Sequence, residues 1–520
     1  MKRPAATILL ALLAAALPGG VSAGDVGDGT YTNPPLFADY PDPDVVRVGE
    51  DFYLVSTTFV NSPGLVVLHS RDLVNWDTVG YVVDRLDGDP KYDMVGGTAY
   101  RNGVFAPSLR HRDGTFYVAV TPNGKRTRIY SAKDPRGPWE RRELNESAFD
   151  PGLFFDDDGT PYIFTSGGWD GQVHLKTLSP ALDRVVASRK LFYVKGVEGC
   201  KVLKINGWYY VFNALPARMA LMCSRARSLD GPWETIKALD DSTGGHQGAI
   251  VDLPDGSWYG FVMRDSGPIG RVTNISPITW KDEWPLWGEP DRPGRVPERA
   301  RKPIQGRPVV ERPISTGFDG PRLDLDWQWN HNPDDARWSL AERPGFLRLH
   351  ATTAPDFWRA RNTLTHKGWG PTSCAVATLD VSGLRPGDVA GLGTLGKSIA
   401  TLAVERSAVG RARLVFSSGV DRSVAVAPRE SADLGDAGTV HLALRMDFTA
   451  GKGRCAYSLD GERWTPFGPD FPLMYHWSSG TFQGQQYALF CFNPGPSDGR
   501  LDVDSVRFTK PSDGDPTARR

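Results

Sequence analysis

The amino-acid sequence predicts an all-β protein, a five-bladed β-propeller followed by a β-sandwich. A hairpin pattern recurs five times in the first half of the chain, and apolar and polar residues alternate in short runs in the second half. A segment rich in proline and arginine separates the two regions. The chain of 520 residues is long enough for two or more domains, and its 57 Gly and 41 Pro supply the turns that such folds need.

The recurring hairpin pattern is a turn with glycine, followed by an aromatic residue that opens an apolar run. Asp-Gly and Asn-Gly favour hairpin turns because Gly and Asn tolerate positive φ. The five glycines are Gly49, Gly114, Gly159, Gly207 and Gly256, so successive copies are 65, 45, 48 and 49 residues apart. This spacing is typical of a four-stranded propeller blade. It predicts five blades over residues 24–290, with no long helix.

A second pattern interleaves with the first. A serine, a polar turn and then a tryptophan occur at Ser70–Trp76, Ser131–Trp139 and Ser224–Trp233. We interpret these segments as outer strands of successive blades, with the indoles packed between blades. Most of the 16 Trp are expected in the core, although Trp also stacks on sugar rings.

The remaining divisions follow from composition. Residues 291–313 are rich in Pro and Arg and lack apolar periodicity, which predicts a linker. Residues 314–510 contain alternating runs such as Leu323–Trp329 and Ala375–Leu379, which predict a β-sandwich. Residues 511–520 form a polar tail.

The N-terminal residues 1–23 have the pattern of a secretory signal peptide. Basic residues come first, an apolar run follows from Ala5 to Leu17, and small residues precede Gly24. That run is too short to span a bilayer, and no later stretch qualifies. We therefore expect a secreted or periplasmic protein. With 60 basic and 61 acidic residues, nothing in the charge balance indicates a nucleic acid or an anionic membrane as partner.

Five cysteines are present, and none forms a Cys-x-x-Cys motif, so a thiolate metal cluster is not expected. Cys200 and Cys223 could form one disulfide, and two of Cys374, Cys455 and Cys491 another. Buried free thiols are the equal alternative.

Three carboxylates stand at the starts of predicted innermost strands. Asp42 lies between two prolines, Asp150 precedes a proline, and Glu198 precedes a glycine. They come 7, 9 and 9 residues before the hairpin glycines at 49, 159 and 207. Because innermost strands line the central channel, we expect all three at the same place in their blades, around one channel mouth.

A cluster of three acids has split pKa values, because burial and repulsion disfavour ionising all of them. Hydrolysis of a glycosidic bond uses such a split, since one carboxyl donates a proton and another activates water. A calcium site in the channel is the alternative, because calcium also recruits carboxylates.

Several longer motifs point to a known family. In the first half they are Asn33–Leu36, Tyr40–Asp44, Ser56–Phe59, Ser70–Trp76, Phe105–Ser108, Phe149–Phe154 and Val197–Gly199. In the second half they are Phe318–Gly320, Trp327–Pro333, Glu342–Leu347 and Ala360–Leu364. With these motifs the chain resembles glycoside hydrolase family 43, the five-bladed propeller β-xylosidases and α-L-arabinofuranosidases. The second half resembles the concanavalin-like, jelly-roll sandwich of the xylosidase branch.

The resemblance implies an inverting mechanism. Asp42 matches the general base, Glu198 the general acid, and Asp150 the residue that tunes the pKa of the acid and orients it. No cofactor is expected to be required, and a structural Ca²⁺ is left open.

The resemblance also implies a sugar pocket. Phe59 and Phe105 match its aromatic positions, and Arg271 matches an arginine that contacts the sugar. His246 matches a channel histidine that in some relatives helps to hold calcium. For Arg271 a buried structural ion pair, and for His246 a hydrogen-bonded channel histidine, are the alternatives.

The sequence departs from the family at the pocket. Glu198-Gly199-Cys200-Lys201 stands where many relatives have Glu-Gly-Pro-His, and Phe105 stands where Trp is common. The exact sugar is therefore open. We expect an exo-acting hydrolase that releases terminal α-L-arabinofuranosyl or β-D-xylosyl units, with the sandwich bracing the propeller and lending a loop to the pocket rim. The alternative is a secreted carbohydrate-binding propeller or lectin without turnover.

Overall fold

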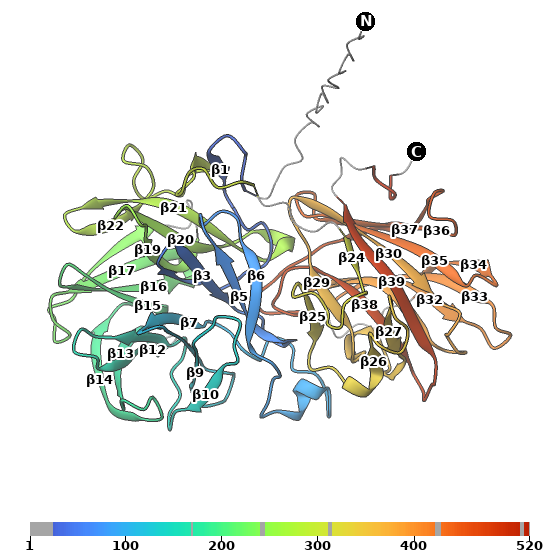
Figure 1. The fold of residues 1–520 in the computed structure, drawn as a ribbon, viewed down its shortest axis with the longest axis horizontal. Helices are drawn as coiled ribbons and strands as arrows, with labels where there is room; N and C mark the ends of the chain where they lie inside the picture. Colours follow the sequence, from blue (N-terminus) through green and yellow to red (C-terminus); the bar gives the residue numbers. More distant parts are fainter. Residues whose placement is uncertain are drawn as a thin grey trace, which may run out of the picture.

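The computed structural model describes residues 24–167, 170–239, 245–309, 315–421, 428–509 and 514–518. Over these residues the protein is all-β, with only short 3-10 turns besides strands. Figure 1 shows a propeller and a sandwich side by side. None of the helical turns in the described ranges is long and apolar enough to cross a lipid bilayer.

The propeller has five antiparallel blades of four strands, numbered from the channel outwards. They are β2 (Asp44–Val48), β3 (Asp51–Ser56), β5 (Gly64–Ser70) and β6 (Asp77–Val83); β7 (Ser108–Arg112), β8 (Thr115–Val120), β9 (Arg128–Ala132) and β10 (Glu140–Glu143); β11 (Gly152–Phe155), β12 (Pro161–Ser166), β13 (Gln172–Leu178) and β14 (Val185–Tyr193); β15 (Glu198–Ile205), β16 (Trp208–Leu215), β17 (Ala220–Ala226) and β18 (Glu234–Leu239); β19 (His246–Asp252), β20 (Trp258–Asp265), β21 (Arg271–Lys281) and β22 (Trp284–Trp287). The innermost strand of each blade contacts that of the next, and β19 contacts β2 to close the ring.

Both sequence patterns of the propeller are confirmed. Each predicted hairpin glycine lies in the turn between the first and second strands of a blade. The predicted tryptophans directly precede the outermost strands, as Trp233 precedes β18. The ring of Trp233 packs at a tilt against Phe192 of the preceding blade, with ring centroids 4.6 Å apart. This indole packs between two blades, as expected.

The described part of the predicted linker, residues 291–309, contacts the propeller. Within it, β23 (Arg299–Arg301) pairs antiparallel with the N-terminal β1 (Thr30–Thr32). Lys302 is buried and its Nζ lies 2.5 Å from a carboxylate oxygen of Asp25 and 2.9 Å from one of Asp72. These contacts join the linker to the start of the propeller and to its first blade.

The sandwich consists of two packed sheets. One contains β24 (Ser315–Gly317), β26 (Trp338–Ser339), β27 (Leu347–His350), β30 (Thr372–Asp380), β35 (Thr439–Asp447), β36 (Lys452–Ser458), β37 (Thr465–Pro472) and β39 (Arg500–Thr509). The other contains β25 (Trp327–Asn330), β28 (Thr352–Thr353), β29 (Leu364–Lys367), β31 (Val389–Leu395), β32 (Ser398–Arg406), β33 (Ala412–Val420), β34 (Pro428–Gly435) and β38 (Gln486–Asn493). Alternating apolar side chains such as Leu402 and Leu444 fill the space between the sheets.

One predicted strand is shorter than its pattern. The alternation over Leu323–Trp329 predicts a continuous strand, but only Trp327 onwards belongs to β25. The preceding residues form a turn closed by a hydrogen bond from the Trp327 amide to the Asp324 carbonyl, 3.1 Å long. A turn interrupts the ladder there even though the apolar pattern continues.

The two domains share a sheet. The two-residue strand β4 (Asn61–Ser62), which belongs to the propeller segment, pairs with β25 and forms the edge of the second sandwich sheet. Next to it, the Ala99 amide donates to Nε2 of His331 over 2.9 Å, and Asn332 exchanges hydrogen bonds with the backbone of Leu86. The motif Trp327–Pro333 thus joins the domains.

The last propeller strand, β22, ends at Trp287, and the sandwich strands run from β24 at Ser315 to β39 at Thr509; the exact domain boundaries stay predictions. The signal-peptide prediction concerns residues 1–23, which lie outside the described residues, so it stays a prediction. All five cysteines are buried free thiols, so the disulfide alternative is wrong and the thiol alternative is confirmed.

Candidate active site

The entrances of the five innermost strands share one backbone feature. Each has a residue with positive φ at the equivalent point of its blade: Asp42 (53°), Ala106 (48°), Asp150 (44°), Gly199 (62°) and Gln247 (54°). Four of these residues are not glycine, and the left-handed region is uncommon for them. Such backbone strain concentrates at functional sites. The repeat places equivalent side chains around one mouth of the channel.

The three predicted carboxylates do not occupy identical positions. Asp42 and Asp150 are both the left-handed residue of their blade, but Glu198 directly precedes the left-handed Gly199. Glu198 is therefore equivalent to Phe105, Phe149 and His246 in the other blades. The expectation of identical places is wrong by one residue for Glu198. The pairing of β15 with β16 is irregular between Glu198 and Lys201. The number of residues from Glu198 to its hairpin glycine therefore does not reveal the offset.

The structure nevertheless brings the three carboxyl groups together. Asp42 is 4% exposed, Asp150 is 7% exposed, and Glu198 is partly buried. Burial, followed by the nearby charges of Glu198 and Asp42, raises the pKa of Asp150 well above its ordinary value. Burial also raises the pKa of Glu198; His246 and Arg271 oppose this effect and Asp42 adds to it. The predicted acid thus holds its proton to higher pH than a free glutamate.

Asp42 is fixed by hydrogen bonds on both carboxylate oxygens. The Thr57 hydroxyl donates to Oδ2 over 2.6 Å, and Nη1 of Arg271 donates to Oδ1 over 3.1 Å. Thr57 is itself held, because its oxygen accepts from the Ala106 amide over 2.8 Å. The amide of Asp42 also lies 3.2 Å from the sulfur of Met263. The carboxylate therefore has one orientation, set from three blades.

Arg271 links Asp42 to the aromatic positions. Its guanidinium carbon lies 5.4 Å from the ring centroid of Phe59 and 4.5 Å from that of Phe482. Phe59 in turn stacks near Phe105, with centroids 6.1 Å apart. Nε and Nη2 of Arg271 are buried and have no hydrogen-bond partner among the described residues. Arg271 thus forms an ion pair with Asp42 and also has two unpaired donor nitrogens. A structural ion pair and a contact to the sugar, the two roles considered for Arg271 from the sequence, are therefore compatible.

The sandwich lends a loop to this site, as expected. Phe482 packs on Phe59, with centroids 4.7 Å apart. The side-chain amide of Gln483 donates to the Thr58 carbonyl over 3.0 Å, and the Gly484 amide donates to Asp39 over 3.0 Å.

Sequence reasoning missed Thr57, Phe482 and the partly buried Tyr475 of the same loop as Phe482. Thr57 lies in a quoted family motif, where its spacing from Asp42 could have drawn attention to it. No local signal marks the loop residues, because they come from the other domain.

His246 begins β19 at the rim. Its Nε2 lies 3.7 Å from Asp265, and its Nδ1 is buried without a hydrogen-bond partner in the described part of the chain. No group of three or more His, Cys, Asp or Glu side chains placed to hold a metal occurs among the described residues, which leave out 240–244 beside His246. The structural calcium ion stays a prediction.

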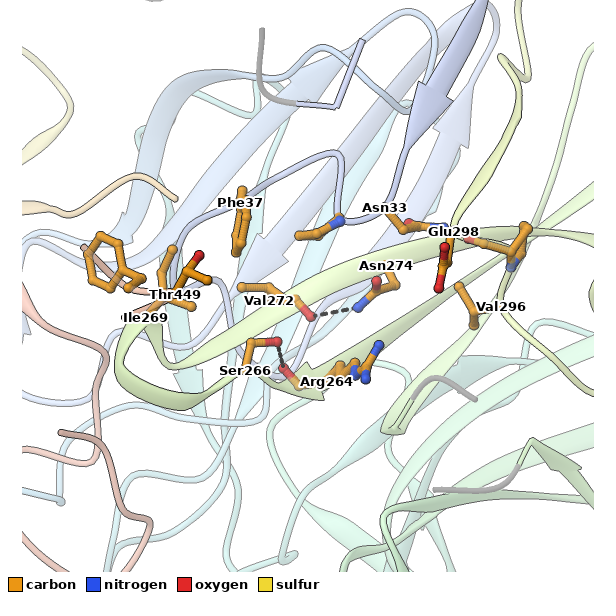
Figure 2. A pocket seen from close by; sticks show the side chains of 13 residues that line it. Asn33, Phe37, Arg264, Ser266, Ile269, Val272, Asn274, Val296, Glu298 and Thr449 are labelled. Atoms are coloured by element: carbon orange, nitrogen blue, oxygen red, sulfur yellow. Dashed lines mark hydrogen bonds between the residues drawn. The ribbon is translucent and has the colours of Figure 1, made fainter. Parts of the chain in front are cut away.

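Two other cavities lie away from the carboxylates. One of about 290 Å³ lies at the junction of propeller, linker and sandwich; Figure 2 shows Asn274 lining it, with Phe37 towards one end and Glu298 towards the other. Another of about 440 Å³ is lined by all five innermost strands on the side where they meet their hairpin turns. Neither is lined by Asp42, Asp150 or Glu198. The three carboxylates lie at the starts of the innermost strands, at the opposite end of the channel from the larger cavity. The candidate site is at this end.

Glycoside hydrolysis uses two carboxyl groups in different environments. This site has one carboxylate, Asp42, fixed by an arginine, and another carboxyl, Glu198, with a raised pKa. The fold and the site define the class as a glycoside hydrolase. Residues 31–285 match the model of glycosyl hydrolases family 43, and residues 315–509 match the β-xylosidase C-terminal concanavalin A-like domain. The chain belongs to glycoside hydrolase family 43.

Curated relatives match from about three fifths to nearly all of the chain. A β-xylosidase of Formosa agariphila is 31% identical over 96% of this chain and 93% of its own length. A non-reducing end α-L-arabinofuranosidase of Bacteroides ovatus is 34% identical over 62% of this chain and 65% of its own length.

Among solved structures, a bifunctional family 43 protein of Bacteroides eggerthii has a TM-score of 0.85 and 33% identity, covering 92% of this chain. This chain spans 63% of that protein. An engineered family 43 enzyme described as having both endo-xylanase and exo-arabinofuranosidase activity has a TM-score of 0.85 and 30% identity, covering 92% of this chain and 99% of its own.

Proposed function

We propose that the protein releases terminal α-L-arabinofuranosyl or β-D-xylosyl units from hemicellulose-derived chains, with inversion at the anomeric carbon. The observation that carries this proposal is the pairing of Asp42, oriented by Thr57 and Arg271, with Glu198, whose pKa burial raises. The pair supplies a base and a proton donor at the same channel mouth.

The reaction is a single displacement. Asp42 accepts a proton from a water molecule as the water oxygen forms a bond to the anomeric carbon. The bond from that carbon to the leaving oxygen breaks, its electron pair stays on the oxygen, and Glu198 supplies the proton. Inversion needs the two carboxyls about 6.5–9.5 Å apart, so that water fits between them. Asp150 tunes the pKa of Glu198 and orients it.

The walls of the site support exo action on a single pentose unit. Phe59, Phe105 and Phe482 form an aromatic cluster that Arg271 joins to Asp42, and the buried Nε and Nη2 of Arg271 have no hydrogen-bond partner among the described residues. Because Phe482 comes from the sandwich, the second domain closes part of the rim. A chain end enters such a closed site more readily than the middle of a polysaccharide.

The choice between xylose and arabinose is tested with a panel of nitrophenyl pentosides, followed by proton NMR of the sugar first released. We expect turnover of the β-D-xyloside, the α-L-arabinofuranoside or both, with the opposite anomer appearing first. Release of the same anomer would refute inversion. Binding of xylo-oligosaccharides without turnover of any glycoside would favour the lectin alternative.

The roles of the two acids are tested by Asp42→Asn and Glu198→Gln. General acid–base groups contribute about 10²–10⁴-fold, so each variant should lose at least ~100-fold in kcat with circular dichroism unchanged. Full activity in either folded variant would contradict the assignment.

We further propose that the protein is exported, on the pattern of residues 1–23 alone. Mass spectrometry of protein from the medium or periplasm should show a new N-terminus near Gly24. An intact N-terminus in the cytoplasm would contradict export.

A further inference from the structure

The cavity of about 440 Å³ lies at the hairpin end of the channel, and the proposed reaction does not use it. All five innermost strands contribute to its wall. Its volume falls in the range of about 300–1,000 Å³ that is usual for small-molecule sites. Between the two ends of the channel runs β15, and its 8 residues span about 25 Å. A ligand in this cavity therefore lies well apart from Asp42 and Glu198.

The charged side chains of the cavity wall balance one another. The wall contains as many basic as acidic side chains, and most of them form ion pairs that bridge neighbouring blades. The pairs are Arg47 with Asp252, Arg110 with Asp44, and Lys204 with Asp156. Paired charges leave no surplus to attract an ion, but their remaining N–H groups and lone pairs still bond to hydroxyl groups. This wall favours a neutral ligand rich in hydroxyls over a phosphate or a metal ion.

Some polar atoms of the wall are free to bind such a ligand. Nε and Nη2 of Arg47 both donate to Oδ2 of Asp252, and Oδ1 of Asp252 has no partner among the described residues. This carboxylate is accessible, since the Asp252 side chain is 39% exposed. The ring of His111 packs against Phe116, and its nitrogens form no hydrogen bond within the described ranges. A sugar hydroxyl both donates and accepts, so it can bond to a carboxylate oxygen and to an imidazole alike.

Trp258 supplies an aromatic ring beside this carboxylate. It begins β20 and lies directly opposite Asp252 of β19, so the two side chains share a face of the blade, and both line the cavity. The Trp258 ring meets that of Trp280 at 82°, with centroids 5.9 Å apart, and no cation lies over it in the described part of the chain. An indole packs against the C–H groups of a sugar ring, and a neighbouring carboxylate bonds to its hydroxyls.

We propose that this cavity is a second, non-catalytic carbohydrate site, which binds a xylo-oligosaccharide with one ring on Trp258 and a hydroxyl on Oδ1 of Asp252. The choice of a xylose-based ligand rests on the function proposed above, in which the substrate comes from hemicellulose. Because the two sites lie at opposite ends of the channel, a chain bound here leaves the catalytic mouth free.

The test follows the fluorine NMR signal of Trp258 in the full chain labelled with 5-fluorotryptophan. The protein carries Glu198→Gln, so that the probe, xylotetraose, is not hydrolysed, and the signal is assigned by its absence in Trp258→Phe. We expect this signal to shift saturably as xylotetraose is added. Inorganic phosphate and calcium chloride, the charged probes, should leave it in place. A Trp258 signal that ignores xylotetraose, or that responds to a charged probe instead, would overturn the proposal.

Asp252→Ala decides whether the sugar is bound in this cavity. The variant removes the carboxylate beside Trp258, so the midpoint of the shift should rise about 10-fold or more, as expected when a hydrogen bond to a charged group is lost. Because the ion pair of Asp252 with Arg47 is partly exposed, its loss costs little stability. An unchanged midpoint would show that the shift is transmitted from the catalytic mouth and would also overturn the proposal.

Trp208 is the matched control. It begins β16 in blade four as Trp258 begins β20 in blade five. The guanidinium carbons of Arg225 and Arg227 lie 4.4 and 4.1 Å from its ring centroid, so cations already cover this indole. The fluorine signal of Trp208, assigned with Trp208→Phe, should stay in place. Equal shifts of both signals would indicate a general change of the protein and contradict a local site.

Activity separates this inference from the proposed function. Asp252→Ala in the otherwise wild-type chain should turn over nitrophenyl pentosides with kcat/KM within about 2-fold of the wild-type value, because the two sites are distant and independent. A large fall would show that the substitution acts through the fold and would overturn the assignment. An inactive wild type on every pentoside would refute the proposed function, whereas an active wild type whose Trp258 signal ignores xylotetraose refutes only this inference.

Discussion

Thr57 and Arg271 fix the direction of Asp42, since each donates to one of its oxygens. Thr57→Val keeps the shape of the side chain but removes the hydroxyl that bonds Asp42 and the Ala106 amide. Two buried polar groups then lose a partner, which costs about 1–3 kcal/mol of stability per group. We expect kcat to fall about 10-fold in nitrophenyl assays, because a misplaced base costs rate. Thr57→Ser should restore most of the rate, and an unimpaired Thr57→Val would contradict this role.

The raised pKa of Glu198 predicts the alkaline limb of the pH profile. A general acid works only when protonated, so kcat/KM should fall as pH rises through this pKa. Burial places that pKa above the ordinary value for glutamate of about 4.3. The measurement is kcat/KM for a glycoside with a poor leaving group between pH 4 and 9, using overlapping buffers. An alkaline fall centred at or below the ordinary value would contradict the effect of burial.

Among secondary-structure elements, the strand entrances and the sandwich loop with Phe482 form the site together. Phe482→Ala removes the ring that packs on Phe59 and faces the guanidinium of Arg271. We expect KM for the preferred pentoside to rise about 10-fold and kcat to change less, because a binding wall is lost while both acids stay. Phe482→Leu should retain more of the affinity. A KM equal to the wild-type value in Phe482→Ala would show that the sugar does not contact this wall.

The strands of the propeller could be predicted from the sequence in greater detail than those of the sandwich. Each Asp-Gly or Asn-Gly turn specifies a local hairpin by itself, so the pattern around Gly159 or Gly207 needs no distant partner. The start of β25 could not be predicted, because the apolar pattern from Leu323 continues through a turn. The one-residue offset of Glu198 was hidden by the irregular register of β15 and β16.

At the scale of the whole molecule, the two domains share a sheet and both contribute to the candidate site. Deleting residues after Pro313 removes β25, the pairing partner of β4, together with the hydrogen bonds of His331 and Asn332 to the propeller. It also removes Phe482 from the rim. We expect insoluble or inactive protein, checked by soluble yield and by turnover of nitrophenyl glycosides. An active, soluble propeller from residues 24–313 would contradict this dependence.

The sequence by itself determined the blade repeat, the domain order and the identity of Asp42, Asp150 and Glu198 as candidates, because each rests on local turn chemistry or a local motif. Only the tertiary structure decided what surrounds them: Thr57 and Arg271 hydrogen-bond Asp42, and Phe482 of the sandwich packs on Phe59 at the rim. The physical reason is the closed ring of blades. Residues more than 200 positions apart, such as Asp42 and Arg271, become neighbours when the ring closes and the sandwich docks, and the burial that shifts each pKa arises from that packing.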